Sequence, residues 1–275
     1  MSIDPAGPAP AGPAPAGPAP DEGPSGTASS ASAGPLRVRI VGAGRAGGSF
    51  AAALREQGWQ VDVVGRDADP TGLAQGVDLV LLCVPDAQVA AVAASIDPVE
   101  GTVVAHCAGS LGLDVLAPHP ARATLHPLVS LPSPELGAAR LRGAWYGISG
   151  DPIAGRVVEA LGGRAVEVAD DDRAAYHAAA VVASNHLVAL LGQVERIAAD
   201  VGVPLEAFLA LASGSLDNVA ALGPSAALTG PVARGDWATV RRHLDAIAPT
   251  ERAAYLEMVR AAAALAGRDV PPLGA

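Results

Sequence analysis

Hydrophobic residues follow two different periods along the chain, and the change falls near residue 168. Before it, short apolar or alternating runs come between segments with helical spacing. Continuous runs such as LVLLCV are typical of parallel strands buried on both faces, and strands that alternate with helices favour a doubly wound parallel sheet. The expected strands cover residues 36–41, 59–64, 77–84, 101–106, 121–127, 144–150 and 164–168.

From Asp170 onward the pattern is helical throughout. Helices are expected over 171–202, 204–222, 236–248 and 250–267. Asp236 and Thr250 are the expected N-caps of the last two, because their side chains accept hydrogen bonds from the free N–H groups of a first helical turn. The sequence therefore predicts an α/β domain over 35–168, followed by an all-α domain over 169–275.

Residues 1–34 differ in composition from the rest of the chain. They repeat short units of Pro, Ala and Gly, and no large apolar residue occurs in them beyond Ile3. Proline at this density removes backbone donors, and the segment has too little apolar surface to bury. We therefore expect a disordered tail ahead of the folded domains.

A glycine-rich turn joins the first predicted strand to the first helix. The turn fits G-x-G-x-x-G, and its residues are Gly42, Ala43, Gly44, Arg45, Ala46 and Gly47. The first glycine permits the tight turn, the second lets the backbone approach a pyrophosphate, and the third lets the helix pack close to the strand. Free N–H groups at the helix start then bind phosphate. Because the motif follows a strand, opens a helix and precedes a second strand, it predicts a Rossmann dinucleotide-binding domain.

The end of the second strand decides between the two nicotinamide dinucleotides. An acidic residue there would bind the ribose 2′-hydroxyl of NAD, but the chain has Gly65 and Arg66. A guanidinium pairs well with the 2′-phosphate of NADP. Asp62 lies too early for the ribose role, whereas Asp67 leaves NAD as the alternative. The sequence favours NADP(H).

Loops at the ends of later strands are expected beside this dinucleotide, because open α/β sheets bind ligands outside the carboxyl ends of their strands. Val84, Pro85 and Asp86 end the third strand, and Asp86 is also expected to cap the next helix. His106 ends the fourth strand and is expected to contact the nicotinamide or its ribose. His126 ends the fifth strand on the same side.

Composition excludes several other functions. All 18 basic residues are arginine, so Schiff-base, catalytic-lysine and Walker-type chemistry are excluded. The net charge of −10 makes nucleic acid and anionic membrane surfaces poor partners. Two cysteines, Cys83 and Cys107, do not make a zinc site, and no metal is expected. Uninterrupted apolar runs are far shorter than the ~20 residues that span a bilayer, and no signal-peptide pattern precedes Arg37, so we expect a cytoplasmic protein.

The order of the motifs carries a family resemblance. From Val41 to Asp236 the chain contains GAGRAG, CVPD, HCAGSLGLDVLAP, LHPL, YHAAAVVASNHLVAL and ALTGPVARGD. In this order they resemble the Rossmann-like and DUF2520 domain-containing oxidoreductases of the 6-phosphogluconate dehydrogenase-like superfamily. The resemblance implies a Rossmann domain followed by one long helix and a small helical bundle. Some members resemble an alternative class of ketopantoate reductase, which would place the chain in pantothenate biosynthesis.

Reduction of a carbonyl by a nicotinamide needs a proton or hydrogen-bond donor at the carbonyl oxygen. Better-known superfamily members use a lysine with an asparagine about one turn later, whereas this chain has Val181 four positions before Asn185. His126 is the first candidate donor, since it ends a strand on the ligand side. His177 is the second: on an α-helix, His177 and Ser184 face within about 20° of each other, and Asn185 lies about 80° round. We expect His177, Ser184 and Asn185 to line one groove, with Asn185 orienting the substrate.

The segment TGPVARGD is expected to be a loop that closes over the cleft. Arg234 offers a bidentate fork and, with Thr229, is expected to bind a substrate carboxylate. The leading hypothesis is an NADP-dependent reductase of a small 2-oxo acid, most specifically 2-dehydropantoate (ketopantoate). An imine reductase or prephenate-type dehydrogenase is the alternative enzyme, and a non-catalytic NADP-binding sensor is the alternative of another class.

A homodimer through the helical domain is also expected, with residues 1–34 uninvolved. The segment AAAVVASNHLVALL is apolar around most of its circumference, which marks a helix covered on several sides.

Overall fold

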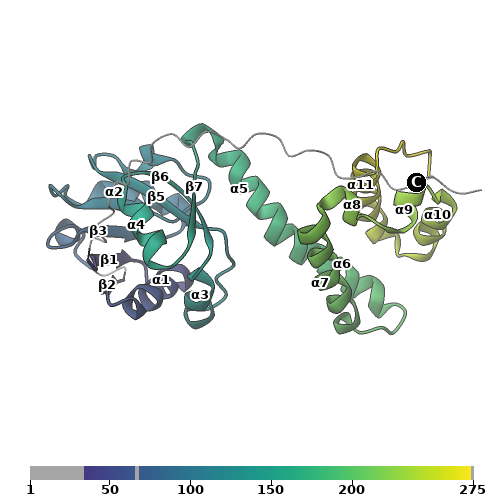
Figure 1. Cartoon of the computed structure of the whole chain (residues 1–275), viewed down its shortest axis with the longest axis horizontal. Helices are drawn as coiled ribbons and strands as arrows, with labels where there is room; N and C mark the ends of the chain where they lie inside the picture. Colours follow the sequence, from purple (N-terminus) through teal and green to yellow (C-terminus); the bar gives the residue numbers. More distant parts are fainter. Residues whose placement is uncertain (1–33, 66–67, 274–275) are drawn as a thin grey trace, which may run out of the picture. The chain divides into compact units, whose positions relative to one another are not determined.

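The computed structural model describes residues 34–65 and 68–273, whose strands form a seven-stranded sheet (Figure 1). The order across the sheet is β2-β1-β3-β4-β5-β6-β7. The strands are β1 (Arg37–Val41), β2 (Gln60–Val64), β3 (Leu79–Leu82), β4 (Val103–His106), β5 (Arg122–Pro127), β6 (Trp145–Gly150) and β7 (Arg164–Glu167). Each strand predicted from the sequence is present. Pairing among β1 to β5 is parallel, so the carboxyl ends of these strands meet at one edge of the sheet.

The last two strands depart from the predicted all-parallel sheet. β6 pairs with β5 in the antiparallel sense, and β7 runs parallel to β6. The connection after β5 contains α3 (Pro134–Leu141), a helix that the sequence analysis did not predict. Because α3 packs on the helix that follows β1, the connection returns to the sheet edge that it left instead of crossing the sheet. A strand that starts from that edge must run antiparallel to β5.

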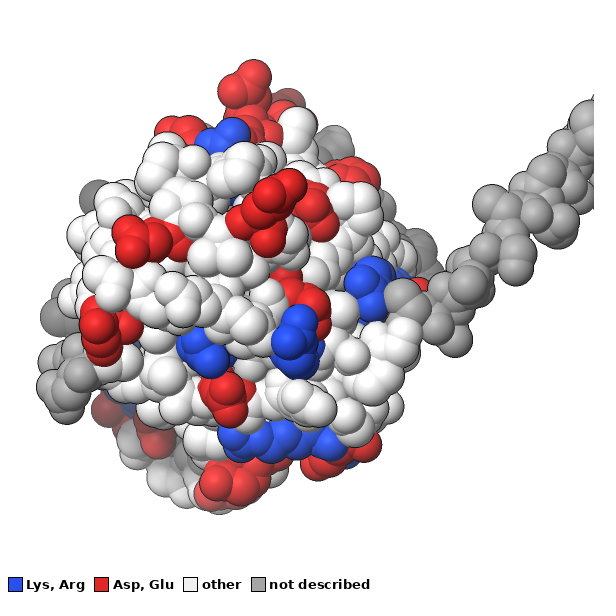
Figure 2. Space-filling view, turned by 90° about the vertical axis from the view of Figure 1, so that its left-hand side faces the viewer, with Lys and Arg blue, Asp and Glu red and all other residues white. Residues whose placement is uncertain are grey.

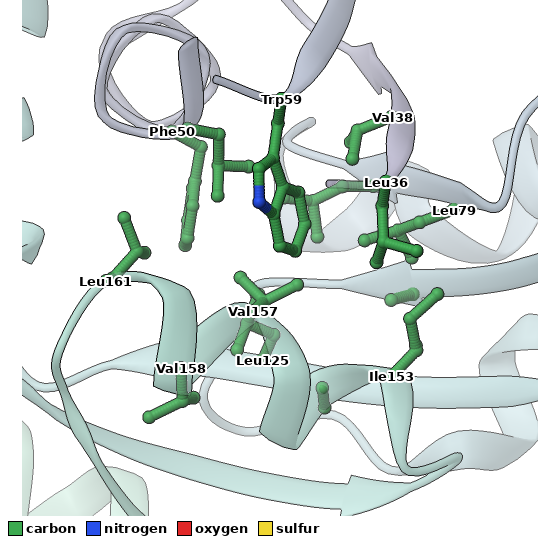
Figure 3. Packing of buried hydrophobic residues seen from close by; sticks show 14 of the residues in the cluster. Leu36, Val38, Phe50, Trp59, Leu79, Leu125, Ile153, Val157, Val158 and Leu161 are labelled. Atoms are coloured by element: carbon green, nitrogen blue, oxygen red, sulfur yellow. The ribbon is translucent and has the colours of Figure 1, made fainter. Parts of the chain in front are cut away.

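Helices cover both faces of the sheet and bury its apolar side chains. They are α1 (Arg45–Glu56), α2 (Asp86–Ser95), α3 and α4 (Ile153–Ala160). On one face, Phe50 of α1, Trp59 and Val157 of α4 lie in one core cluster, with Val157 facing Trp59 (Figure 3). On the other face, Val89 and Ala93 of α2 pack on β3 and β4. Burial on both faces explains why β3 and β4 read as continuous apolar runs.

After β7 the described chain contains only helices. They are α5 (Arg173–Val181), α6 (Leu187–Ala199), α7 (Leu205–Leu222), α8 (Pro224–Ala227), α9 (Gly230–Arg234), α10 (Trp237–Ala246) and α11 (Pro249–Leu265). This confirms the predicted order of a Rossmann-type sheet followed by an all-α region. A π-helical segment, Val182–His186, joins α5 to α6, so the long helix is unbroken as expected. The domain boundaries at residues 34 and 168 stay predictions.

One of the two predicted caps in the helical region is confirmed. The carboxylate of Asp236 accepts a hydrogen bond from the backbone N–H of Thr239 at 3.1 Å and so caps α10. The prediction for Thr250 is wrong, because α11 already begins at Pro249 and its N-cap is Ala248. Proline favours the first helical position, where its fixed φ suits the helix and its missing N–H removes no bond.

The helices α5 to α7 are exposed although they are apolar. None of the residues of α7, all of them described, is buried, and α5 buries only Arg173. The exposed large apolar residues of α6 and α7 are Val188, Leu190, Leu209, Leu211, Leu216, Val219 and Leu222. By length and composition, two stretches could cross a membrane, Asp170–Ala199 and Leu205–Leu222; two such helices are weak evidence. The sequence analysis missed them because it counted only uninterrupted apolar runs.

Charged side chains of both signs are mixed on the face shown in Figure 2. Among its described residues, arginines lie beside carboxylates and are separated by uncharged surface. Several arginines of the described chain are ion-paired, as Arg37 is with Asp78 and Arg142 with Glu56. In each of these pairs, a carboxylate neutralises the positive charge of the arginine.

Candidate functional site

The glycine turn after β1 has the geometry that its sequence predicts. Gly42 has φ +109°, and a Cβ there would lie 2.5 Å from the carbonyl oxygen of Cys83. A Cβ at Gly47 would overlap the carbonyl oxygen of Gly42, so this glycine lets α1 pack directly on the turn. Gly44 differs, because nothing lies within 4 Å of its Cβ position. The turn is therefore tight at its two ends and open in its middle.

The open middle of the turn fits a pyrophosphate. Gly44 is the N-cap of α1, its backbone is extended, and no side chain caps the helix. The first N–H groups of α1 therefore face outward without a side-chain partner, as an anion site requires. Ala43 and Arg45 beside it are exposed. Arg66 and Asp67 lie outside the described residues, so the choice between NADP and NAD stays a prediction.

The loop after β3 lies at the same sheet edge as the glycine turn. Val84 is partly buried, and Pro85 and Asp86 are exposed. The predicted cap by Asp86 is wrong: Pro85 is the N-cap of α2, and no side chain caps this helix. Asp86 is the first helical residue, where its charge still stabilises the helix start. Its carboxylate accepts a hydrogen bond from the hydroxyl of Ser110 at 3.4 Å, which joins the loops after β3 and β4.

Polar side chains replace the apolar ones on one face of β4, β5 and β6. His106 is paired with Thr124, and Thr124 with Ser149. Two residues further along β5, His126 is paired with Gly147 of β6. Because side chains alternate along a strand, Thr124 and His126 lie on one face of β5, opposite to Ala123 and Leu125 of the apolar core.

His106 is held within the protein by both nitrogens of its ring. The side chain is fully buried. Its Nδ1 accepts a hydrogen bond from the backbone N–H of Ala108 at 3.2 Å, which leaves Nε2–H to donate to the carbonyl oxygen of Gly112 at 3.1 Å. Burial lowers the pKa of His106. The predicted contact of His106 with a nicotinamide stays untested, and the bonds shown here give the ring a role in shaping the loop after β4.

Arg173 fastens the start of α5 to this polar face. Its side chain is buried and donates to the hydroxyls of Thr124 and Ser149. Its Nε lies 3.6 Å from the carboxylate of Asp170. The Nη1 of Arg173 has no hydrogen-bond partner among the described residues. Burial lowers the pKa of this guanidinium, which nevertheless keeps its charge at neutral pH.

His126 and His177, the two candidate proton donors, lie together. Their ring centroids are 5.7 Å apart, in an edge-to-face arrangement. His126 Nδ1 lies 2.8 Å from the phenol oxygen of Tyr176, a residue that the sequence analysis did not select. Burial, together with the neighbouring His177 and Arg173, lowers the pKa of His126 to about 4. His126 is therefore neutral at neutral pH.

Gly109, in the loop after β4, lies against both histidines. A Cβ at this position would lie 2.9 Å from His126 Nε2 and would overlap His177 Nδ1. His177 Nδ1 is buried and has no hydrogen-bond partner among the described residues. The end of β4, the end of β5 and the first turns of α5 thus meet in one cluster, which we call the His126–Tyr176–His177 cluster.

Ser184 and Asn185 contact each other but do not hydrogen-bond to this cluster within the described chain. The Ser184 hydroxyl lies 2.7 Å from the carbonyl oxygen of Ala180 and 2.9 Å from the side-chain oxygen of Asn185. Both residues are exposed and belong to the π-helical segment. A π turn holds more residues than an α turn, so the expected alignment with His177, which assumed 3.6 residues per turn, changes at this segment.

Thr229 and Arg234 flank a short helix instead of forming the expected loop. Thr229 is the N-cap of α9, and Arg234 is its last residue, followed by Gly235 with φ +73°. Arg234 is exposed. Neither side chain forms a described hydrogen bond with the sheet, so their predicted binding of a carboxylate stays a prediction.

Two family models match the chain in sequence. A Rossmann-like domain matches residues 66–132, and DUF2520, a domain of unknown function, matches residues 148–262. The first match spans β3 to β5, and the second runs from β6 into α11. No curated protein matches the chain in sequence.

Solved structures share the fold over most of the chain. A Bacteroides fragilis protein assigned as an NADP oxidoreductase is 18% identical with a TM-score of 0.69, over 84% of this chain and 98% of its own. A Thermotoga maritima protein is 26% identical with a TM-score of 0.65, again over 84% and 98%. The reductive aminase of Aspergillus terreus, solved with NADPH and ethyl-5-oxohexanoate, is 17% identical with a TM-score of 0.64, over 87% and 98%. At these identities, the first and third likenesses are likenesses of fold.

Proposed function

We propose that this chain, which belongs to the Rossmann-like and DUF2520 domain-containing proteins, is an NADP-dependent oxidoreductase. The observation that carries the proposal is the placement of an open glycine turn and a polar cluster on one sheet edge. The turn lies after β1 and the cluster after β4 and β5, two and three strand spacings or roughly 10–14 Å from it. NADP(H), when bound, supplies or accepts a hydride. Residues 42–47, the loop 84–86 and Arg66 would hold it.

The substrate that we propose is a small 2-oxo acid, most specifically 2-dehydropantoate, which would place the protein in pantothenate biosynthesis. The carbonyl would lie against the His126–Tyr176–His177 cluster, with Asn185 orienting it. Thr229 and Arg234 would bind the carboxylate, since a guanidinium offers two parallel donors to a carboxylate. Arg173 is charged and buried beside the polar face of β4, β5 and β6, and its Nη1 has no hydrogen-bond partner among the described residues, which supports an anionic substrate.

Cofactor choice is tested by titrating the protein with NADPH and with NADH. We expect NADPH to bind at least about tenfold tighter, a difference of about 1.4 kcal/mol, because Arg66 faces a phosphate in one cofactor and a hydroxyl in the other. Arg66→Ala should remove the difference, whereas Arg260→Ala, a change on the exposed surface of α11, should keep it. Equal affinities for the two cofactors in the wild-type protein would contradict the prediction.

Substrate class is tested by following NADPH oxidation with a panel of 2-oxo acids and cyclic imines, and NADP⁺ reduction with prephenate. Turnover of 2-oxo acids is the expected result. Preferential reduction of imines would favour the alternative enzyme, for which the fold likeness to a reductive aminase speaks. Tight NADPH binding without turnover of any panel member would instead favour a non-catalytic sensor and would overturn the proposal.

We also propose that the chain forms a homodimer through residues 169–275 and works in the cytoplasm. The exposed apolar side chains of α6 and α7 support a protein partner on these helices, because large exposed apolar patches mark interaction sites. A second copy supplies a matching apolar surface at the same concentration as the first.

A further inference from the structure

Tyr176 lies in the cluster of proposed catalytic histidines, in contact with two strands. Its ring is edge-on to that of His126, with centroids 5.5 Å apart. Its hydroxyl overlies the backbone of Gly147 on β6, where any Cβ would overlap the phenol oxygen. Both Tyr176 and His126 are only partly buried. The hydroxyl therefore lies over Gly147 of β6 and beside His126 of β5.

One neighbour is within hydrogen-bond distance of the phenol oxygen, namely His126 Nδ1 at 2.8 Å, and the backbone of Gly147 lies directly beneath it. A phenol has one proton to donate and two lone pairs to accept with. When Nδ1 carries the single proton of the neutral imidazole, it donates to one lone pair of the phenol, and the phenolic proton is free for another group. An oxygen that loses its proton in this place remains stabilised by this donor.

The protonation states in the cluster differ in a way that matters for proton transfer. Burial raises the pKa of Tyr176, although Gly147 and Arg173 partly oppose the shift, so the phenol keeps its proton at neutral pH. The lowered pKa of His126 leaves that ring without a second proton above about pH 4. At neutral pH, the imidazole is neutral and donates to Tyr176 when its proton lies on Nδ1, while the phenol is an acid in its protonated form.

We infer that Tyr176 donates the proton to the carbonyl oxygen, with His126 and Gly147 as positioning groups; this rests on the proposed function. The carbonyl carbon gains a hydride and is reduced as the dihydronicotinamide is oxidised, and the π electron pair of the C=O bond moves onto oxygen. That oxygen forms a new O–H bond with the Tyr176 proton as the phenolic O–H bond breaks. The phenolate recovers its proton from water, which completes the balance.

The pH dependence of kcat in the wild-type protein separates Tyr176 from a histidine donor. A histidine with an ordinary pKa loses activity as the pH rises through about 6.5. With Tyr176 as donor, kcat for reduction stays level from about pH 6 to about pH 9 and falls only as the phenol ionises. A fall of kcat centred near pH 6.5 would overturn the inference, and this measurement needs no variant.

Tyr176→Phe is the matching variant, with Tyr255→Phe as its control. Tyr255 is a second tyrosine whose hydroxyl is bonded to a histidine, His243 Nδ1 at 2.7 Å, but it lies on α11. Tyr176→Phe should lower kcat by roughly 10²–10⁴ and keep the Kd for NADPH within about twofold. Tyr255→Phe should leave both unchanged. An ultraviolet titration should show that Tyr176→Phe has lost one phenol that ionises above the ordinary pKa of about 10.

The outcomes separate the inference from the function on which it rests. If the wild-type protein reduces 2-oxo acids and Tyr176→Phe keeps a near-normal kcat, the inference fails and the proposed function stands. If the wild-type protein binds NADPH but reduces nothing in the panel, the function fails and the inference with it. A Tyr176→Phe protein whose thermal unfolding matches the wild type and whose kcat is lowered supports both.

Discussion

The sheet and the helices α5 to α7 are similarly apolar in sequence but differ in what covers them. Each residue of β3 and β4 is buried between layers of helices. In α7, which is long and apolar enough to pass as a membrane span, no residue is buried, although the whole helix is described. Strands of the sheet find their partners within one chain, whereas these helices present a surface that the described residues do not cover.

The size of the uncovered surface favours a second copy over a solvated state. A fully buried leucine or valine contributes about 1.5–3 kcal/mol relative to an exposed one. Because these side chains are already partly covered, burial of all the exposed apolar residues of α6 and α7 would contribute on the order of 5–10 kcal/mol, which is comparable to the loss of freedom on association. The C-terminal helices show the contrast, since Val232, Val240, Leu244 and Val259 form a small core of their own.

The largest effect is expected from charges placed on the uncovered helices. Leu209→Glu combined with Leu216→Glu should raise the dimer Kd at least about 1,000-fold, or about 4 kcal/mol, because each carboxylate would have to be buried without a partner. Leu136→Glu on α3 is the matched control, since Leu136 and Leu216 are exposed to 57% and 56%. Sedimentation of the full chain measures all three proteins.

Two results would contradict this proposal of a dimer. One is a wild-type protein that sediments as a monomer at micromolar concentration. The other is a protein that floats with lipid vesicles and stops doing so when both leucines carry a charge, which would make a membrane the covering surface.

An intermediate effect on folding stability is expected at His126, a partly buried polar residue of β5. Its pKa is lowered from 6.5 to about 4, so the unfolded chain takes up a proton as the pH falls through 6.5 and the folded chain takes it up only near pH 4. The folded state is therefore favoured fully above pH 6.5, and it loses up to about 3 kcal/mol between pH 6.5 and pH 4.

Denaturant unfolding of wild type and His126→Gln at several pH values measures this contribution. The variant should lose less stability than the wild type over that interval, since glutamine does not titrate. Parallel losses in the two proteins would show that His126 does not carry the effect.

The sequence predicts the parts of this molecule that depend on local pattern. The buried strands, the turn at Gly42 and the long helix follow from periodicity and from glycine spacing, and His126 follows from its place at a strand end. Tyr176, Gly109 and Gly147 could not be selected in this way, because their roles arise from the register between strands and from the face of α5 that packs on them. Alternation in ATLHP, with Thr124 and His126 on one face, was the available signal.

The antiparallel β6 has the same kind of cause. Its direction follows from where α3 packs, a contact with α1 that lies far away in sequence. Two site residues form no described hydrogen bond with the cluster: Asn185 was selected from helical spacing and from the resemblance, and Arg234 from its residue type. The sequence offered no periodic pattern that tests whether Arg234 contacts the sheet. For Asn185, the π-helical segment changes the helical alignment with His177 that the sequence predicted.

The smallest effect compares two glycines, one in each region, that sit inside helices. A Cβ at Gly47 would overlap the carbonyl oxygen of Gly42, so Gly47→Ala should destabilise the chain by about 2 kcal/mol, as overpacking does, and should weaken NADPH binding. Nothing lies within 4 Å of a Cβ at Gly214 in α7, so Gly214→Ala should raise helix stability by about 1 kcal/mol, because alanine is the better helix former. Both changes are measured by denaturant unfolding, in the wild type and in the Leu209→Glu, Leu216→Glu background that separates the copies. A gain from Gly214→Ala in that background, together with a loss of dimer affinity in the wild type, would show that the partner's backbone approaches α7 closely. A loss of unfolding free energy in the separated chain would instead mean that α7 is already packed within one copy, and the contrast between the two regions would not hold.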